Sequence, residues 1–477
     1  MRFAVDAAAG ANLLACMKQV ASIVVRPPAV AGAFYPAEAE QLATDVASLV
    51  AAAVQPQPRL GWPKVLVVPH AGYVYSGSVA AAAYSEWRRG FRQIRRVVVL
   101  GPVHRVAVQG IALAGADIFA TPLGQVPVDR HAEAQLRDLP WVVQNPRAHA
   151  WEHSLEVQLP FLQHILESFT VVPLAVGDAT PQEVAQVIER LWGGPETVFA
   201  VSTDLSHFHA QAEAEVLDGE TAEQILTLRS DIRHDQACGA TPLNGMLLAA
   251  QRHGLLIRRV AQCTSGDTSG DTSGDRARVV GYGAFALEDP EITGNSGGRL
   301  LVSLARQAIA HRLEVGPPPR TSRWWLQAVG ATFVTLKQHG DLRGCVGTLE
   351  ARWPLGQDLL ANALHAAFDD PRFLPVDQTD WPHISVEVSV LSAPQPMVFT
   401  SEADLLAQLQ PGVDGLILEA HGRRGTFLPQ VWDDVPDPRQ FLTFLRAKAG
   451  VPADTPVEHC RVWRYHVAKF TEEEIRS

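Results

Sequence analysis

Histidines stand directly behind two apolar runs of this 477-residue chain. His70 follows KVLVVP and His104 follows RRVVVLGPV, while a third run, VFAVST, leads into Asp204 and His207. Imidazole and carboxylate groups are ligands for iron(II) and zinc, and a histidine beside such a site can also transfer protons. A single histidine of this kind is more often a structural group, so the question is whether the chain brings these four residues together.

The apolar runs are predicted to be neighbouring strands of one sheet. Strands are expected over 65–68, 96–104, 170–178 and 198–209. They alternate with helical segments of about 10 to 15 residues, which predicts an α/β domain with a mostly parallel central sheet covered by helices. Because parallel strands end at the same edge of a sheet, the histidines behind them are expected to converge on a shared metal or acid–base site.

The third ligand of such a site has two candidates. Two imidazoles and one anionic group, with open positions left over, are typical of non-haem iron(II) oxygenases and catalytic zinc sites. Asp204 would supply a carboxylate, whereas Cys238 in ACGATP would supply a thiolate and a softer site that also suits copper or zinc. His207 is expected to lie beside Asp204 on one helical turn and to act as a general acid or base.

A further histidine is expected on a helix over 152–169. His153 and Glu156 are three residues apart and would share one face of that helix. The pair is either part of the acid–base machinery, with His153 as a catalytic residue, or an ordinary exposed pair.

Length, composition and the positions of turn-forming residues predict that the chain has more than one domain. At 477 residues, 47% of them hydrophobic and 19% charged, the chain exceeds one ordinary core. We predict an N-terminal extension (1–24), a metal-binding domain (25–288), a linker (289–298) and a second domain (299–477). The second domain shows hairpins and helices that do not alternate, which predicts an α+β fold. Three tandem TSGD repeats at 264–275 predict a loop.

The net charge and the cysteines restrict the kinds of partner and the cellular compartment that we expect. A formal charge of −11 argues against nucleic acid and anionic membranes as generic partners. No apolar run approaches the ~20 residues that a transmembrane helix needs. The five cysteines are scattered without a CxxC pair, which fits a reducing cytoplasm.

The second domain contains one conspicuous stretch, LRGCVGT. Its glycines would display Cys345, and Arg343 stands two residues earlier. A nucleophilic cysteine needs a cationic or histidine neighbour, so Cys345 and Arg343 are candidate catalytic residues. The alternative is a tight turn with a packed cysteine.

Ordered motifs give both halves a family resemblance. Residues from about 26 to 287 resemble the Memo family (AmmeMemoRadiSam system protein B) through AGAFYP, PHAGYVYSG, LGPVH, EHSLEVQLPFL, STDLSHF, CGATP and GYGAFAL. Residues from about 298 to 474 resemble the AMMECR family (system protein A) through LRGCVGTL, DPRF, ISVEVSVL, GVDGL and TFLPQVW. The chain therefore resembles a fusion of two proteins often encoded beside a radical SAM enzyme.

The resemblance implies a fold and a ligand set. The Memo family is similar in fold to the class III extradiol dioxygenases, which hold iron(II) on two histidines and a carboxylate. Carried over to this sequence, the resemblance implies His70, His104 and Cys238 as metal ligands, with Asp204 and His207 as neighbouring acid–base groups. A thiolate would replace the carboxylate, so ring cleavage is not implied by the fold alone.

Three functions follow from these observations. The first is a metal-dependent redox enzyme, with iron(II) ahead of copper or zinc, that oxidises a small aromatic or otherwise oxidisable substrate with dioxygen. Its AMMECR-like domain would bind or help to modify the substrate, with a radical SAM protein as partner. The second is a non-catalytic metal- or peptide-binding protein. The third is a zinc hydrolase with His207 as the base.

Overall fold

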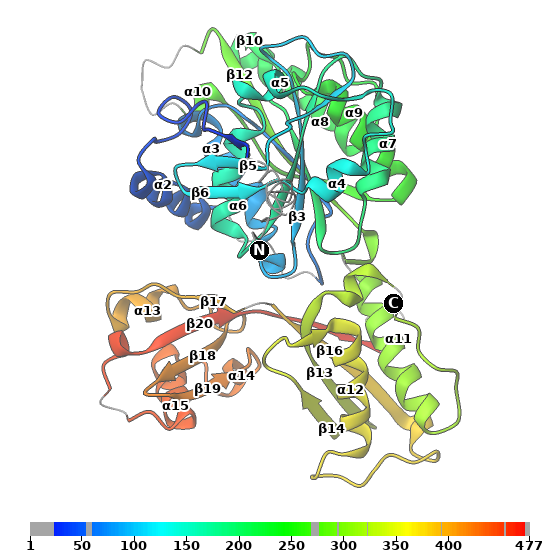
Figure 1. Cartoon of the computed structure of the whole chain (residues 1–477). Coiled ribbons are helices and arrows are strands. Elements are labelled where there is room, and N and C mark those ends of the chain that lie inside the picture. Colours follow the sequence, from blue (N-terminus) through cyan, green and yellow to red (C-terminus); the bar gives the residue numbers. More distant parts are fainter. Residues whose placement is uncertain are drawn as a thin grey trace, which may run out of the picture.

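The structure is a computed structural model that describes residues 23–53, 60–268, 276–292, 295–321, 323–392, 394–452 and 455–472. The N-terminal half is a wide sheet between helices, and the C-terminal half forms two smaller lobes below it (Figure 1). Residues 1–22 of the predicted extension and 269–275 of the TSGD repeats lie outside the described residues; the start of the repeats forms the short helix α10 (Ser265–Thr268), so the loop prediction is wrong there. None of the helices in the described ranges is long and apolar enough to cross a membrane.

The large sheet of the described N-terminal half has nine strands with a parallel centre. Its order is β10-β12-β2-β9-β3-β8-β4-β7, with β11 paired to β12. The parallel central strands are β2 (Val65–Val68), β9 (Thr197–Ser202), β3 (Arg96–Pro102) and β8 (Thr170–Val176). The outer strands are β4 (Ile111–Leu113), β7 (Val142–Gln144), β10 (His207–His209), β11 (Leu256–Thr264) and β12 (Val279–Glu288).

The sheet is mixed rather than mostly parallel. Beside β2, β12 runs antiparallel and pairs in turn with β11, and β4 runs antiparallel to β8. The prediction is right for the central strands and wrong for the edges. The reason is that the chain reaches β12 by an antiparallel return from β11 and not by a helical crossover.

Helices cover both faces of this sheet, as predicted. Leu66 and Val68 of β2 belong to one buried cluster, whereas Val65 and Val67 belong to the other. On the first face lie α2 (Ala39–Ala52), α3 (Tyr73–Ser85) and α6 (Leu159–Ile165). On the second face lie α7 (Pro181–Leu191), α8 (Gln211–Leu226) and α9 (Ala240–His253). Strands buried on both faces explain the continuous apolar runs in the sequence.

The helix predicted over 152–169 is confirmed for 159–165, which form α6, and wrong for the residues that precede them. The chain instead forms α5 (Pro146–Ala150), a turn, the 3-10 segment η2 (Glu156–Gln158) and then α6. Glu156 is fully buried and accepts hydrogen bonds from Arg26, Tyr35 and the backbone N–H of Ala29. Glu156 therefore does not form an exposed helical pair with His153. Its partners are more than 120 residues away in the sequence, so local periodicity could not predict these contacts.

A small sheet ties the start of the described chain to this half. It is built from β1 (Val25–Arg26), β5 (Ile118–Thr121) and β6 (Gly124–Pro127), with α4 (Arg130–Ala134) following.

The C-terminal half has an α+β arrangement in two lobes. The first sheet contains β13 (Val329–Gln338), β14 (Asp341–Gly347), β15 (Trp353–Pro354), β16 (Ile384–Leu391) and β21 (Val467–Thr471), and packs on α11 (Asn295–Arg312) and α12 (Leu355–Phe368). The second contains β17 (Gln395–Pro396), β18 (Gly415–Ala420), β19 (Arg423–Phe427) and β20 (Arg461–Tyr465), with α13 (Glu402–Gln408), α14 (Val431–Asp434) and α15 (Pro438–Ala449). Every strand pairing described in both sheets is antiparallel.

The two halves meet at the amino-terminal edge of the large sheet. Leu287, near the end of β12, lies opposite Val65 at the start of β2, so the chain leaves the sheet at that edge. Beyond it, the indole N–H of Trp324 donates to Asp289 (3.1 Å), and the amide of Gln93 donates to the carbonyl of Val329 (3.2 Å). The predicted linker, 289–298, contains the 3-10 segment η3 (Pro290–Ile292) and the first residues of α11, while 293–294 lie outside the described residues.

Candidate metal centre

Three histidines lie together at the carboxyl-terminal edge of the large sheet. His70 follows β2, His104 follows β3, and His153 belongs to the turn after α5. Each offers a ring nitrogen, and these nitrogens lie within 4.8 Å of one another. Nitrogens bound to one transition-metal ion at about 2.1 Å are roughly 3 to 4 Å apart, so small side-chain shifts would let the three converge on an ion. The convergence of His70 and His104 follows the prediction, and His153 joins them.

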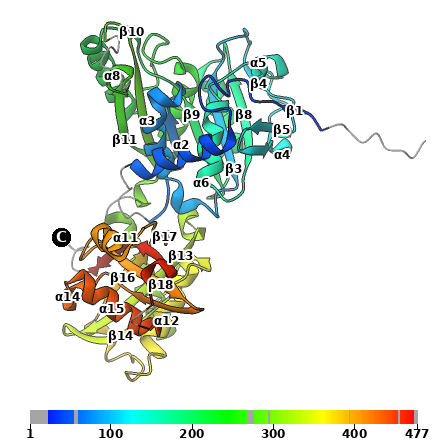
Figure 2. The same cartoon turned by 90° about the vertical axis from the view of Figure 1, so that its left-hand side faces the viewer.

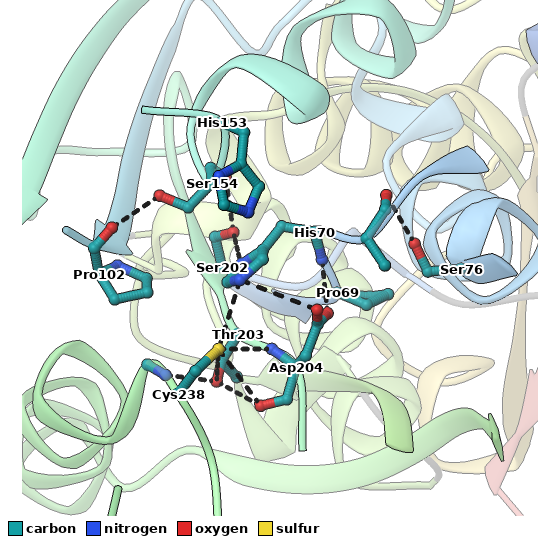
Figure 3. A network of polar contacts seen from close by, with 12 residues as sticks. Pro69, His70, Ser76, Pro102, His153, Ser154, Ser202, Thr203, Asp204 and Cys238 are labelled. Carbon is teal, nitrogen blue, oxygen red and sulfur yellow. Dashed lines mark hydrogen bonds and ion pairs between the residues drawn. The ribbon is translucent and has the colours of Figure 1, made fainter. Parts of the chain in front are cut away.

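The hydroxyl of Ser202 fixes the ring of His70. Ser202 ends β9 and donates its hydroxyl proton to the carbonyl of Ser154 (2.6 Å), so its oxygen accepts from His70 Nδ1 (2.8 Å) (Figure 3). The proton of the His70 ring therefore sits on Nδ1, and the lone pair of Nε2 faces the centre. Complete burial lowers the pKa of His70, so the ring is neutral and able to bind a cation.

A carboxylate fixes the ring of His104 in the same way. Glu152 accepts from His104 Nδ1 (2.9 Å) and from its backbone N–H (2.6 Å). Burial alone would raise the pKa of Glu152, but the hydrogen bonds from His104 and from the Ser154 backbone outweigh it and lower the pKa to about 2. The ionised carboxylate leaves Nε2 of His104 free, which is the usual support of a metal-bound histidine.

His153 carries a buried nitrogen without a hydrogen bond. Its Nδ1 has no hydrogen-bond partner among the described residues, although Glu152 Oε1 lies 3.4 Å away. The ring packs against Phe34, with ring centroids 4.7 Å apart, and burial lowers the pKa of His153 to about 4. A neutral imidazole whose buried nitrogen is unpaired, beside two imidazoles whose Nε2 atoms are turned to the centre, fits a transition-metal ion.

Cys238 lies beside His70, just before α9. Its sulfur is 3.3 Å from His70 Nε2 and 3.3 Å from the backbone nitrogen of Asp204, which donates to it. Burial, reinforced by the charge of Asp204, raises the pKa of this thiol to about 12, so only a bound cation would convert it to a thiolate near neutral pH. Figure 3 shows the sulfur directed toward His70. His70 is thus flanked by His153 and Cys238, and Cys238 as the third ligand stays a prediction.

Asp204 lies on the same side of His70. One carboxylate oxygen accepts from the backbone N–H of His70 (2.8 Å), and the other is 3.8 Å from His70 Nε2. Burial raises the pKa of Asp204 to about 7. A carboxyl group that titrates near neutral pH is suited to accept or release a proton beside the centre.

His207 does not share a helical turn with Asp204. Residues 203–206 are extended because the backbone of Leu205 donates to Gly281, and Gly281 donates back to Ser206, which draws this segment along β12. His207 then begins β10, with Nδ1 2.8 Å from the carbonyl of Leu205. Burial lowers the pKa of His207, so it is a neutral imidazole at the edge of the centre.

The predicted site around Cys345 is built differently. Arg343 donates to the carbonyl of Leu374 (2.6 Å) and to Asp380 (3.0 Å), and so joins β14 to the segment before η5 (Trp381–His383). Asp370 accepts from the backbone of Cys345 (2.9 Å), whose sulfur accepts from the hydroxyl of Thr335 (3.3 Å). Arg343 therefore fixes a loop, and the reactivity of Cys345 stays a prediction.

Two supporting residues were missed from the sequence. Glu152 stands immediately before His153 within EHSLEVQLPFL, and Ser202 is the last residue of the apolar run before Asp204. A carboxylate adjacent to a suspected ligand is the signal that could have found Glu152. Nothing local marks Ser202, because its partner His70 is 132 residues away.

The fold and the centre together define an α/β protein with a histidine-rich candidate metal site, followed by an α+β region. A family model described as Memo-like protein matches residues 26–286, and a second, described as AMMECR1, matches residues 302–470. The chain belongs to the Memo family, with an AMMECR1 domain in the same polypeptide.

Relatives match the N-terminal half at nearly their full length. A MEMO1 family protein of Ignicoccus hospitalis is 34% identical over 293 residues, covering 55% of this chain and 98% of the relative. One of Methanococcoides burtonii is 34% identical over 279 residues, covering 55% and 100%. A solved structure of an uncharacterized protein from Pyrococcus horikoshii is 35% identical and covers 37% of this chain and 91% of its own, with a TM-score of 0.33.

Proposed function

We propose that the N-terminal half is a metal-dependent redox enzyme that oxidises a small aromatic or otherwise oxidisable substrate with dioxygen. The observation that carries the proposal is the group of neutral imidazoles of His70, His104 and His153 at one edge of the sheet. Iron(II) is the preferred metal, with copper or zinc as alternatives, and the carried-over ligands are His70, His104 and Cys238. An ion held there would supply the redox chemistry.

The surrounding residues have separate tasks in this proposal. Ser202 and Glu152 orient two imidazoles with their lone pairs inward. Asp204, whose pKa burial raises to about 7, exchanges a proton with the substrate, and the neutral His207 is its acid–base partner. Phe34, packed on His153, offers an apolar surface to an aromatic ring.

The AMMECR1 domain binds substrate or helps to modify it, at a site away from the metal centre. Trp62, which packs on Trp324 of the C-terminal half, precedes β2, whereas His70 follows it. The seven residues between Trp62 and His70 span on the order of 20 to 25 Å if extended. We propose that a radical SAM protein of the AmmeMemoRadiSam system is a partner and that the chain works in the cytoplasm. Cys345 and Arg343 remain the candidate residues of this domain.

Iron retention tests the proposal directly. The full chain is loaded anaerobically with iron(II), desalted and analysed for metal, alongside the variants His70→Ala, His104→Ala, His153→Ala and Cys238→Ser. We expect His70→Ala and His104→Ala to lose most of the iron, while the other two variants decide which side chain is the third ligand. The matched control is His131→Ala, an exposed histidine on α4.

The remaining functions are outcomes of the same experiment. Full iron retention by His70→Ala would contradict the proposed centre. Tight retention in the wild type without oxygen consumption over a panel of aromatic substrates would favour a non-catalytic metal-binding protein. Hydrolytic activity restored by zinc and not by iron would favour a hydrolase with His207 as base.

A further inference from the structure

A cavity of about 620 Å³ lies where the two halves meet. One wall comes from the segments that precede β2 and β3, and the other comes from the first C-terminal sheet together with β18, β19 and β20. Ligand pockets commonly occupy about 300 to 1,000 Å³ and often lie between domains. The cavity is at the amino-terminal edge of the large sheet, so a ligand in it does not touch the histidine centre.

The charged lining carries an excess of guanidinium groups. The charged residues that line the cavity are Arg89, Arg92, Arg424, Glu350 and Glu419. Each glutamate also pairs with an arginine outside the lining, Glu350 with Arg352 (2.7 Å) and Glu419 with Arg461. Arg424 shares the carboxylate of Glu350, and Arg92 pairs with Glu167 across solvent, where an ion pair is weak. The cavity therefore suits a ligand with more than one negative charge.

Aromatic faces line the same space. Trp463 lies 5.9 Å from the guanidinium of Arg424, and Phe91 and Trp62 belong to the opposite wall. Aromatic surfaces beside arginines favour planar rings, because stacking and cation–π contacts both use the face of a ring.

Two lining residues contribute buried polar atoms that lack hydrogen-bond partners. The indole N–H of Trp62, a residue only 3% exposed, and Oε1 of Gln93 are unpaired among the described residues. The other amide atom of Gln93 donates to Val329, which fixes Oε1 as an acceptor. Both atoms lie beneath the cavity surface, so a ligand reaches them only after the two side chains turn toward it. An unpaired buried donor or acceptor costs about 1 to 3 kcal/mol, which favours that movement for a ligand that offers both an acceptor and a donor along one edge.

We propose that this cavity binds a planar heteroaromatic ring that carries a phosphate group, as in a nucleoside 5′-monophosphate. The ring edge pairs with Trp62 and Gln93, the ring face packs on the aromatic walls, and the phosphate lies between Arg92 and Arg424. A phosphate monoester fits better than a carboxylate because it carries close to two charges and three acceptor oxygens. This binding site is independent of the metal centre.

Calorimetric titration of the full chain tests the inference. The probes are AMP, GMP, CMP and UMP, with inorganic phosphate and adenosine as the two isolated parts. We expect at least one monophosphate to bind in the micromolar range, at least about tenfold more tightly than either part. No binding of any monophosphate at about 1 mM would overturn the proposal, and so would phosphate binding as tightly as the nucleotides.

Matched arginine variants locate the site. Arg92→Gln and Arg424→Gln are each expected to weaken binding about tenfold, whereas Arg95→Gln, an arginine outside the lining that bonds to Ser168, should not. Thermal melting confirms that each variant is folded, and Arg92→Gln is the cleaner variant because the ion pair that it breaks, with Glu167, is exposed. Equal binding by both cavity variants and the control would overturn the assignment.

Discussion

The histidine centre and the Cys345 cluster carry similar side chains but use them in opposite ways. In the centre, Ser202 and Glu152 each hold Nδ1 of an imidazole and turn Nε2 toward the centre, where Nε2 of His70 meets the sulfur of Cys238. In the Cys345 cluster, Arg343 bonds to Leu374 and Asp380 within its own lobe. The histidine centre thus directs nitrogen lone pairs toward a common point, whereas the Cys345 cluster uses its polar groups to hold a loop.

Whether the polar groups already have partners distinguishes a candidate binding site from a structural cluster better than the types of residue do. Both regions contain a cysteine near charged groups, and both are conspicuous in the sequence. Nδ1 of His153 is buried and unpaired among the described residues and belongs to a group of three imidazoles, which together favour a ligand; Nδ1 of His149 is unpaired as well but belongs to no such group among the described residues. A guanidinium that already has its partners contributes to stability without a ligand.

The largest expected effect concerns the buried neutral histidines of the first half. Burial lowers the pKa of His149 to about 4, and its Nε2 bonds to the carbonyl of Ala112 (2.9 Å). Below about pH 6.5 His149 is protonated in the unfolded chain but stays neutral in the folded chain. The free energy of unfolding therefore decreases as the pH falls from 6.5 toward 4, by about 3 kcal/mol from this residue.

Urea unfolding of the metal-free chain between pH 7 and pH 4 measures this loss. His149→Gln removes the titrating group, and the difference in stability between wild type and variant should shrink as the pH falls. A difference that stays constant over this range would show that His149 is not a buried neutral group.

The second effect concerns the support of His104. Glu152→Gln removes the charge that fixes the ring, and metal affinity should fall about 10- to 100-fold. Competition with a fluorescent chelator measures the affinity, and Glu167→Gln, an exposed carboxylate, is the control. Unchanged affinity would mean that Glu152 only stabilises the turn that carries His153.

A smaller effect is expected when the loop clamp of the second region is removed. Arg343→Met removes the hydrogen bonds from the guanidinium to the carbonyl of Leu374 and to Asp380. The loss should destabilise the C-terminal half by about 1 to 3 kcal/mol. Iron retention should not change. The exposed Arg352→Met is the control for stability, and loss of iron from Arg343→Met would contradict the separation of the two regions.

The smallest effect separates the two cysteines. Cys345→Ser should leave both iron retention and the rate of oxygen consumption at the wild-type values, because the sulfur of Cys345 contacts only groups of its own lobe among those described. Cys238→Ser should change the metal content, since its sulfur lies 3.3 Å from His70. Oxygen consumption abolished by Cys345→Ser would show that both regions serve one reaction.

The strand ends were predictable because local sequence determines them. Pro69 and the Gly101–Pro102 pair stop apolar runs that can only be buried strands, and a histidine follows each stop. Antiparallel β11 was missed because it is a half-exposed strand that contains Arg258 and Arg259 and so shows no continuous apolar run.

What could not be predicted depends on contacts between distant residues. The break in the expected helix over 152–169 follows from the pairing of Glu156 with Arg26. The place of His153 among the ligand nitrogens follows from the turn that replaces that helix. Periodicity describes one segment at a time and contains no information on either contact.

The chain leaves the large sheet beside the start of β2, and this position determines which edge of the sheet the C-terminal half covers. Since the C-terminal half packs at that edge, none of its described contacts reaches the opposite edge, where His70 and His104 lie. Figure 2 shows the C-terminal half below the N-terminal half, on the side where the chain leaves β12. The cavity between the halves and the histidine centre therefore lie at opposite ends of the same set of strands, so that a change at one of them has to cross the whole sheet to reach the other.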